Sequence, residues 1–182
     1  MKNIILTFFF VLFFVGNNIY GQDNQTIDLE RVYNFLNSTI ANDTTKFNLS
    51  ECANFEFFLT DTTSILKDKL FNKTDKDFFR EQFSKPQKFK WQENKIIGAK
   101  IIPERELEKV FKHRKEGWTK FRKEYGKCLT DFSLPIFNKD FTYCIFYQWT
   151  QCGYLTGYGS LDLYKFENNK WIFIKHYMTG IS

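Results

Sequence analysis

The sequence is poor in the two residues that most often interrupt regular secondary structure. Among 182 residues there are only 3 Pro and 9 Gly, which excludes a collagen-like or low-complexity chain. No heptad pattern persists, and no segment recurs at an interval of about 20 to 50 residues, which excludes a coiled coil, a solenoid and a propeller. With 43% hydrophobic and 20% aromatic residues, the chain is instead predicted to fold around a core.

Residues that bind metals or perform nucleophilic chemistry are also scarce. The two histidines, His113 and His176, lie far apart, and no Cys-x-x-Cys motif occurs, so we expect no metal site. No Gly-rich phosphate-binding loop is present, and we expect no cofactor. Ser160, in Gly157-Tyr158-Gly159-Ser160-Leu161-Asp162, lacks the Gly two residues after it that a nucleophile elbow requires.

The longest apolar run stands at the beginning of the chain. Lys2 precedes the run from Ile4 to Val15, and polar residues follow it. This is the pattern of a signal peptide over residues 1–21, cleaved after Gly21. The run is shorter than the roughly 20 apolar residues that span a bilayer, so no stable membrane anchor is expected. Residues 22–182 are predicted to form one domain that is exported to the periplasm or secreted.

All four cysteines lie in the predicted exported part. Disulfides persist in such a location, and the candidates are Cys52, Cys128, Cys144 and Cys152. Three full pairings remain open. For Cys144, which lies within an apolar segment, the alternative is a buried free thiol.

The first half of the chain favours helices. We expect a helix over residues 28–40 capped by Asp28, a loop over 41–53, a strand at 55–59 and a helix at 64–71. The segment from Thr74 to Asp77 resembles a capping box and predicts a helix that ends before Pro86.

The second half favours strands. We expect a hairpin over residues 88–102, a helical segment over 104–125 split near Gly117, and strands over 141–149, 158–166 and 171–178. Gly157 and Gly159 predict a bend or bulge where the second of these strands begins. The fold class is therefore predicted to be α+β, with the N-terminal and central helices packed on one face of an antiparallel sheet that ends in a three-stranded meander.

Two surface features remain as candidates for binding. Basic residues cluster in the helical segment, namely Lys109, Lys112, Lys115, Lys120, Arg122 and Lys123. Glutamates interspersed at helical spacing favour a solvated face, with contact to an anionic surface or polyanionic glycan as the alternative; we expect no nucleic-acid partner. The rings of Trp149, Tyr154 and Tyr158, near strand ends, are candidate ligand-binding residues that would stack on a sugar or peptide. Tyr143 and Tyr147 alternate with Cys144 and Phe146, so both faces of that strand carry apolar bulk.

A pattern in the C-terminal third resembles that of small exported proteins of the Bacteroidota that have no assigned activity. It consists of Phe132-Ser133-Leu134-Pro135-Ile136-Phe137, Asp140, Cys152-Gly153, Gly157-Tyr158-Gly159, Leu163-Tyr164-Lys165 and Asn169-Lys170-Trp171. The resemblance implies an envelope or secreted location. It also implies a second Cys where this chain has Thr156, so the partner of Cys152 stays open. The closing hairpin with Trp171 is similar to the last strands of the cone-shaped nuclear-transport-factor-like fold, which, with a cystatin-like fold, is the alternative architecture.

The functional prediction is a non-catalytic binding or interaction module of the cell envelope or exterior, whose partner is a protein or a small molecule. We predict no catalytic residues. One alternative is a secreted hydrolase acting on glycan or peptide, in which carboxylates among Asp131, Asp140, Asp162 and Glu167 converge. Another is an inhibitor or immunity-type protein that blocks one enzyme.

Overall fold

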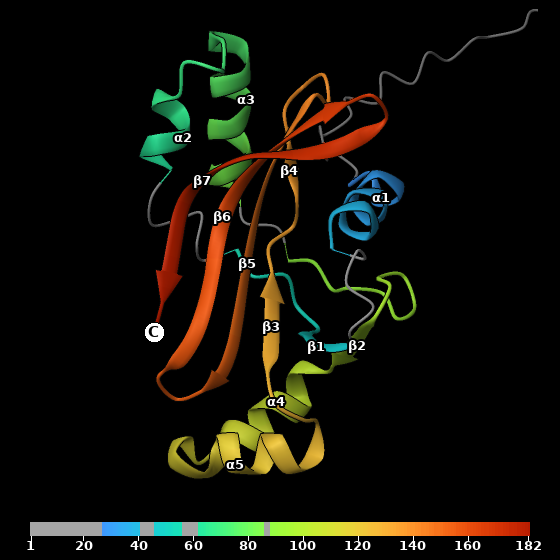
Figure 1. Cartoon of the computed structure of the whole chain (residues 1–182), viewed down its shortest axis with the longest axis vertical. Coiled ribbons are helices and arrows are strands. Elements are labelled where there is room, and N and C mark those ends of the chain that lie inside the picture. Colours follow the sequence, from blue (N-terminus) through green and yellow to red (C-terminus); the bar gives the residue numbers. More distant parts are fainter. Residues whose placement is uncertain (1–26, 41–45, 56–61, 86–87) are drawn as a thin grey trace, which may run out of the picture.

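The computed structural model describes residues 27–40, 46–55, 62–85 and 88–182 (Figure 1). The predicted signal peptide lies outside these residues. So does most of the strand predicted at 55–59, of which only Phe55 is described, without regular secondary structure.

The described part of the chain forms five helices and seven strands. The helices are α1 (Leu29–Thr39), α2 (Thr63–Lys67), α3 (Lys73–Ser84), α4 (Glu104–Phe111) and α5 (Arg114–Glu124). The strands are β1 (Phe47–Ser50), β2 (Ala99–Ile102), β3 (Leu129–Phe132), β4 (Ile136–Phe137), β5 (Tyr143–Gly153), β6 (Thr156–Glu167) and β7 (Lys170–Ile181).

The fold is α+β, as predicted, and its strands form one sheet. The strand order is β2-β1-β3-β5-β6-β7, with β4 also pairing with β5. The antiparallel meander β5-β6-β7 is confirmed. Its last turn is closed by Asn168 and Asn169, both at positive φ, which suits a tight two-residue hairpin.

Two sequence predictions are wrong at the other edge of the sheet, and both concern β1 and β2. The segment predicted as a loop over 41–53 contains β1, which pairs in parallel with both β2 and β3. The hairpin predicted over 88–102 does not form, because Lys90 makes only an isolated bridge to Cys52. The sheet is therefore mixed rather than wholly antiparallel.

Helix boundaries differ from the prediction in two places. The capping box of α3 is formed by Asn72 and Asp75, not by Thr74 and Asp77. The break in the 104–125 segment falls at Lys112 and His113 rather than at Gly117. Gly117 instead lies against Phe111, since a Cβ at Gly117 would come within 2.6 Å of that ring. The Asp28 cap of α1 forms as predicted, with the carboxylate accepting from the backbone N–H of Arg31.

Helices cover both faces of the sheet, which corrects the expectation of one covered face. Alternate residues of β5 point in opposite directions. Cys144 and Phe146 pack in one cluster with residues of α1, whereas Ile145 and Tyr147 pack in another with residues of α2 and α3. We call these the α1 face and the α3 face. Helices α4 and α5 form a third cluster and lie together at the end of the molecule away from α3 (Figure 1).

Gly157 and Gly159 lie against the side chain of Trp149 near the start of β6. A Cβ at Gly157 would come within 2.9 Å of the Trp149 side chain, and one at Gly159 within 2.6 Å of it. The register between β5 and β6 shifts between Gln151, which pairs with Gly157, and Gly153, which pairs with Thr156, so a β-bulge or irregularity lies where β6 begins. The predicted irregularity at the start of this strand is therefore present beside Gly157, and the two glycines also make room for Trp149.

Among the described residues, no helix has the length and apolar character needed to cross a membrane.

Candidate functional site

The side chains on the α1 face change from apolar to polar along β5 and β6. Where α1 packs, it carries apolar residues such as Phe146. Further along, the register pairs Gln148 with Ser160 and Thr150 with Tyr158, so hydroxyl and amide groups replace the apolar side chains on the same face.

A cavity of about 740 Å³ opens beside this polar part of the α1 face. Its volume falls within the roughly 300–1,000 Å³ of small-molecule sites. It is lined by Thr39, Ile40, Lys46, Phe47, Asn48, Lys100, Tyr125, Gly126, Lys127, Cys128, Thr130, Phe132, Gln148, Thr150, Tyr158 and Tyr164. The lining thus combines α1, β1, β2, the turn before β3, and strands β3, β5 and β6.

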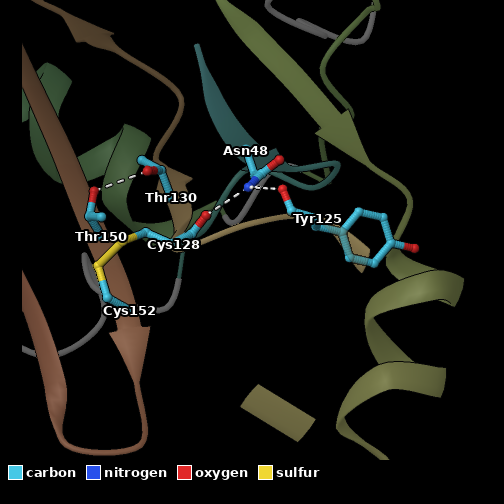
Figure 2. Close-up of a disulfide and its surroundings, with 6 residues drawn as sticks. All are labelled: Asn48, Tyr125, Cys128, Thr130, Thr150 and Cys152. Atoms are coloured by element: carbon cyan, nitrogen blue, oxygen red, sulfur yellow. Dashed lines mark hydrogen bonds between the residues drawn. A yellow bond between two sulfur atoms is a disulfide. The ribbon is translucent and has the colours of Figure 1, made fainter. Parts of the chain in front are cut away.

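One wall of the cavity is fixed by a disulfide and by side-chain hydrogen bonds (Figure 2). The Cys128–Cys152 bridge joins the segment before β3 to β5. The Asn48 amide donates to the carbonyl oxygens of Tyr125 (3.1 Å) and Cys128 (2.9 Å). The hydroxyls of Thr130 and Thr150 lie 3.0 Å apart. This wall is held in place by groups drawn from three strands and one turn.

The cavity connects to a buried carboxylate through Tyr164. The Tyr164 hydroxyl donates to Asp162 Oδ2 at 3.5 Å, and Ser160 Oγ donates to the same oxygen at 2.8 Å. His176 Nδ1 lies 2.7 Å from Asp162 Oδ1. Burial, together with the nearby Asp162 carboxylate, raises the pKa of the Tyr164 phenol, which keeps it a hydrogen-bond donor at neutral pH.

The aromatic candidates occupy three different environments. Tyr158, 59% exposed, lines the cavity. Tyr154, 53% exposed, lies in the turn between β5 and β6. Trp149 is partly buried on the α3 face, over Gly157, Gly159 and Gly180. The structure therefore brings only Tyr158 of these three to the cavity.

The carboxylates of the hydrolase hypothesis do not share partners. Asp131 pairs across the strands with Trp149 and so points to the α3 face, whereas Asp162 pairs with Phe146 and points to the α1 face. Burial raises the pKa of Asp131, partly offset by a hydrogen bond from Ser50. Asp140 accepts from Thr142, and Glu167 pairs with Lys165.

The cysteines divide into one bridge and two free thiols. Cys128 and Cys152 are joined, Cys144 is buried, and Cys52 is partly exposed. Burial and a hydrogen bond to Glu104 raise the pKa of the Cys52 thiol.

Glu51, Cys52 and Glu104 form a cluster that the sequence analysis did not identify. Their donor atoms lie within 4.8 Å of one another, as metal ligands would. The Lys90 ammonium already lies 2.9 Å from Glu51, and the raised pKa of Cys52 favours the thiol over the thiolate that binds metals. The cluster is therefore a poor candidate for a metal site.

The basic residues of the helical segment lie on or beside α4 and α5. Lys109 pairs with Glu106 at 3.0 Å, in line with the solvated face expected from the interspersed glutamates. Lys120, Arg122 and Lys123 are exposed, and the cavity lining includes none of these residues. The side chain of Lys115 lies outside the described ones.

Several lining residues carried no signal recognised in the sequence, namely Lys46, Asn48, Lys100, Lys127, Thr130 and Thr150. Along β5, the alternate residues on the α1 face change from Cys144 and Phe146 to Gln148 and Thr150. This change from apolar to polar side chains is the one local sequence pattern that indicates an uncovered part of that face.

Comparisons with protein-family models, with curated proteins and with solved structures find no match for this chain.

Proposed function

We propose that this protein is an exported, non-catalytic binding module that holds a small organic molecule in the cavity on its α1 face. The observation that carries the proposal is the cavity itself, which has a volume of about 740 Å³ and a lining of aromatic, hydroxyl and amide groups. Concave sites of this kind, with a few convergent polar groups, are the usual places where proteins bind small molecules.

The lining suits a ligand with a flat or apolar body. Phe47 and Phe132 lie with ring centroids 5.7 Å apart, and both line the cavity. Tyr158 adds an exposed ring. Aromatic rings provide a large contact area at a low cost in side-chain entropy, while the hydroxyls of Thr130 and Thr150 and the amide of Gln148 offer hydrogen bonds.

The hydrogen bonds beside the cavity favour binding over catalysis. A serine nucleophile needs a base that takes its proton. Ser160 Oγ donates to the Asp162 carboxylate, and His176 bonds to the other oxygen of the same carboxylate. The network therefore orients Asp162 rather than activating Ser160.

Export is supported by the Cys128–Cys152 disulfide, because such bridges persist outside the cytoplasm.

A thermal-shift screen of the chain against sugars, nucleotides, peptides, lipids and organic acids tests the proposal. A ligand present at about 100 times its Kd stabilises the folded state by about 2.7 kcal/mol. For a domain of this size, the melting temperature should then rise by about 5–10 °C. Thr150→Phe, which places a ring in the cavity, should abolish the shift, whereas Tyr154→Ala, in the β5–β6 turn and outside the lining, should leave it unchanged. A shift that survives Thr150→Phe would place the ligand elsewhere.

Binding of a protein partner is the second candidate function, and the edge of the sheet favours it. β7 is the last strand in the order, and its Ile172, Phe173 and Ile174 are each at least 40% exposed. An edge strand with exposed apolar residues can pair with another chain. This function would be favoured by two results together. No small molecule would raise the melting temperature, and a partner protein that binds the wild-type chain would no longer bind the Ile174→Lys variant.

A further inference from the structure

We infer that the ligand of the cavity is an amphiphilic organic anion, with an acidic group at the mouth and an apolar or aromatic body inside. The inference rests on the proposed function, since it names the ligand class of the same cavity.

The charged residues of the described lining are of one sign. They are Lys46, Lys100 and Lys127, and among the residues that the structure describes the lining includes no Asp, Glu or Arg. The chain as a whole is far more balanced, with 26 basic and 21 acidic residues. Three lysines around one cavity, with no carboxylate among the described lining residues, give it a local positive potential.

The three lysines come from three separate elements. Lys46 directly precedes β1, Lys100 lies on β2, and Lys127 belongs to the turn before β3. All three are exposed. Lysines from three separate parts of the fold thus bring positive charge to one cavity.

These lysines differ from many others in the chain by their partners. Lys85, Lys90 and Lys165 each pair with a carboxylate. Among the described residues, no ion pair involves Lys46, Lys100 or Lys127. Their charge is therefore not neutralised by an ion pair within the described part of the chain.

The surroundings of Lys100 do not cancel this charge. Its Nζ lies 5.2 Å from the centroid of the Tyr125 ring, a cation–π contact. Burial, with Glu106 and Glu124 nearby, raises the pKa of the Tyr125 phenol, so the ring stays neutral. Glu106 is itself paired with Lys109.

The inner part of the lining suits the body of such an anion. Ile40, Phe47 and Phe132 are apolar, and the Thr130–Thr150 pair and Gln148 supply neutral polar groups. The ligand is expected to be amphiphilic because the lining is divided in the same way, into exposed lysines at the mouth and apolar and neutral polar residues inside. A carboxylate, a sulfonate and a phosphate monoester share the required charge.

Two fluorescent probes with the same aromatic body test the inference: 8-anilinonaphthalene-1-sulfonate, which is anionic, and N-phenyl-1-naphthylamine, which is neutral. We expect the sulfonate to bind about tenfold more tightly at low salt, with the difference shrinking as salt screens the lysines. Equal or tighter binding of the neutral probe would overturn the inference and leave the proposed function standing. If neither probe binds, or if Thr150→Phe removes neither, the proposed function falls as well.

Lysine variants then locate the effect. Lys46→Gln, Lys100→Gln and Lys127→Gln should each weaken sulfonate binding by about three- to tenfold and leave the neutral probe unchanged. Lys120→Gln is the matched control, because Lys120 is exposed on α5 and outside the lining. If Lys120→Gln has the same effect as the three lining variants, the preference arises from the net charge of +5, and the inference is wrong.

Discussion

Gly159 on β6 pairs with Trp149 on β5, and the space beside it has no room for a Cβ. A Cβ at this position would lie 2.2 Å from the Gln148 carbonyl oxygen, which is backbone and has little room to move. Gly159→Ala should therefore lower the free energy of unfolding by about 1–3 kcal/mol in a denaturant titration. Gly153→Ala is the control, since its nearest neighbour would lie 3.5 Å away, and we expect a change within about 0.5 kcal/mol. Equal effects at both positions would contradict the packing described for Trp149.

Asp131 and Asp140 should affect stability in opposite directions as pH changes. Burial raises the pKa of Asp131, so the folded state disfavours its carboxylate, and stability is lost as pH rises above the carboxyl's usual value of 3.8. Asp131→Asn should therefore raise the free energy of unfolding at pH 7 and change it little at pH 3.

Hydrogen bonding to Thr142 lowers the pKa of Asp140, so its carboxylate stabilises the folded state at neutral pH. This stability is lost as pH falls through the lowered pKa. Asp140→Asn should consequently be destabilising at pH 7 and less so at pH 3. Denaturant titrations of the Asp131→Asn and Asp140→Asn variants at pH 3 and pH 7 check both predictions. A stabilising effect of Asp140→Asn at pH 7 would contradict the lowered pKa of Asp140.

At the scale of elements, the start of α3 distinguishes the structure from the sequence prediction. The Asn72 side chain accepts from the Asp75 N–H and forms the cap, whereas the sequence pattern placed the cap at Thr74. Asn72→Ala should cost about 0.5–2 kcal/mol. Thr74→Ala, inside the first turn, should have little effect or stabilise slightly, because Ala has the higher helix propensity. If Thr74→Ala lowered the melting temperature more than Asn72→Ala does, the cap would lie at Thr74 instead.

The elements that the sequence predicts well are those with a long periodic pattern. α1 and the strands β5, β6 and β7 span 11 or 12 residues each, so their apolar spacing and the Asn168–Asn169 turn are visible in the chain. β1 and β2 have 4 residues each, too few to show alternation. They pair in parallel, so no hairpin turn connects them, and their place in the sheet depends on tertiary contacts.

At the scale of the whole molecule, the cavity could not be predicted because its lining runs from Thr39 to Tyr164. Only the assembled sheet brings these residues together. The sequence analysis identified Tyr158 as an exposed ring near a strand end, and its exposure is confirmed. Its role in binding stays a prediction. The pairing of Cys128 with Cys152 selects one of the bridges that the sequence left open.

Loss of the disulfide should lower both the free energy of unfolding and the affinity of the cavity for its ligand. It closes a loop of 24 positions, and replacing both cysteines by Ser should cost about 2–4 kcal/mol. Because Cys128 lines the cavity and its carbonyl holds Asn48, the same double variant should also bind the neutral naphthylamine probe more weakly. Cys52→Ser is the control for both measurements. A wild-type chain whose unfolding is unchanged by reductant would show that the bridge is absent.

The most direct test of the central claim is a two-dimensional ¹H–¹⁵N NMR titration of the chain with the neutral naphthylamine probe. If the cavity binds it, the largest shift changes should fall on the amides of Thr130, Gln148, Thr150 and Tyr158, which line the cavity from three strands. Changes confined to Ile172, Phe173 and Ile174 on the exposed edge of β7, or no changes at all, would contradict the claim that the α1 face is the binding site.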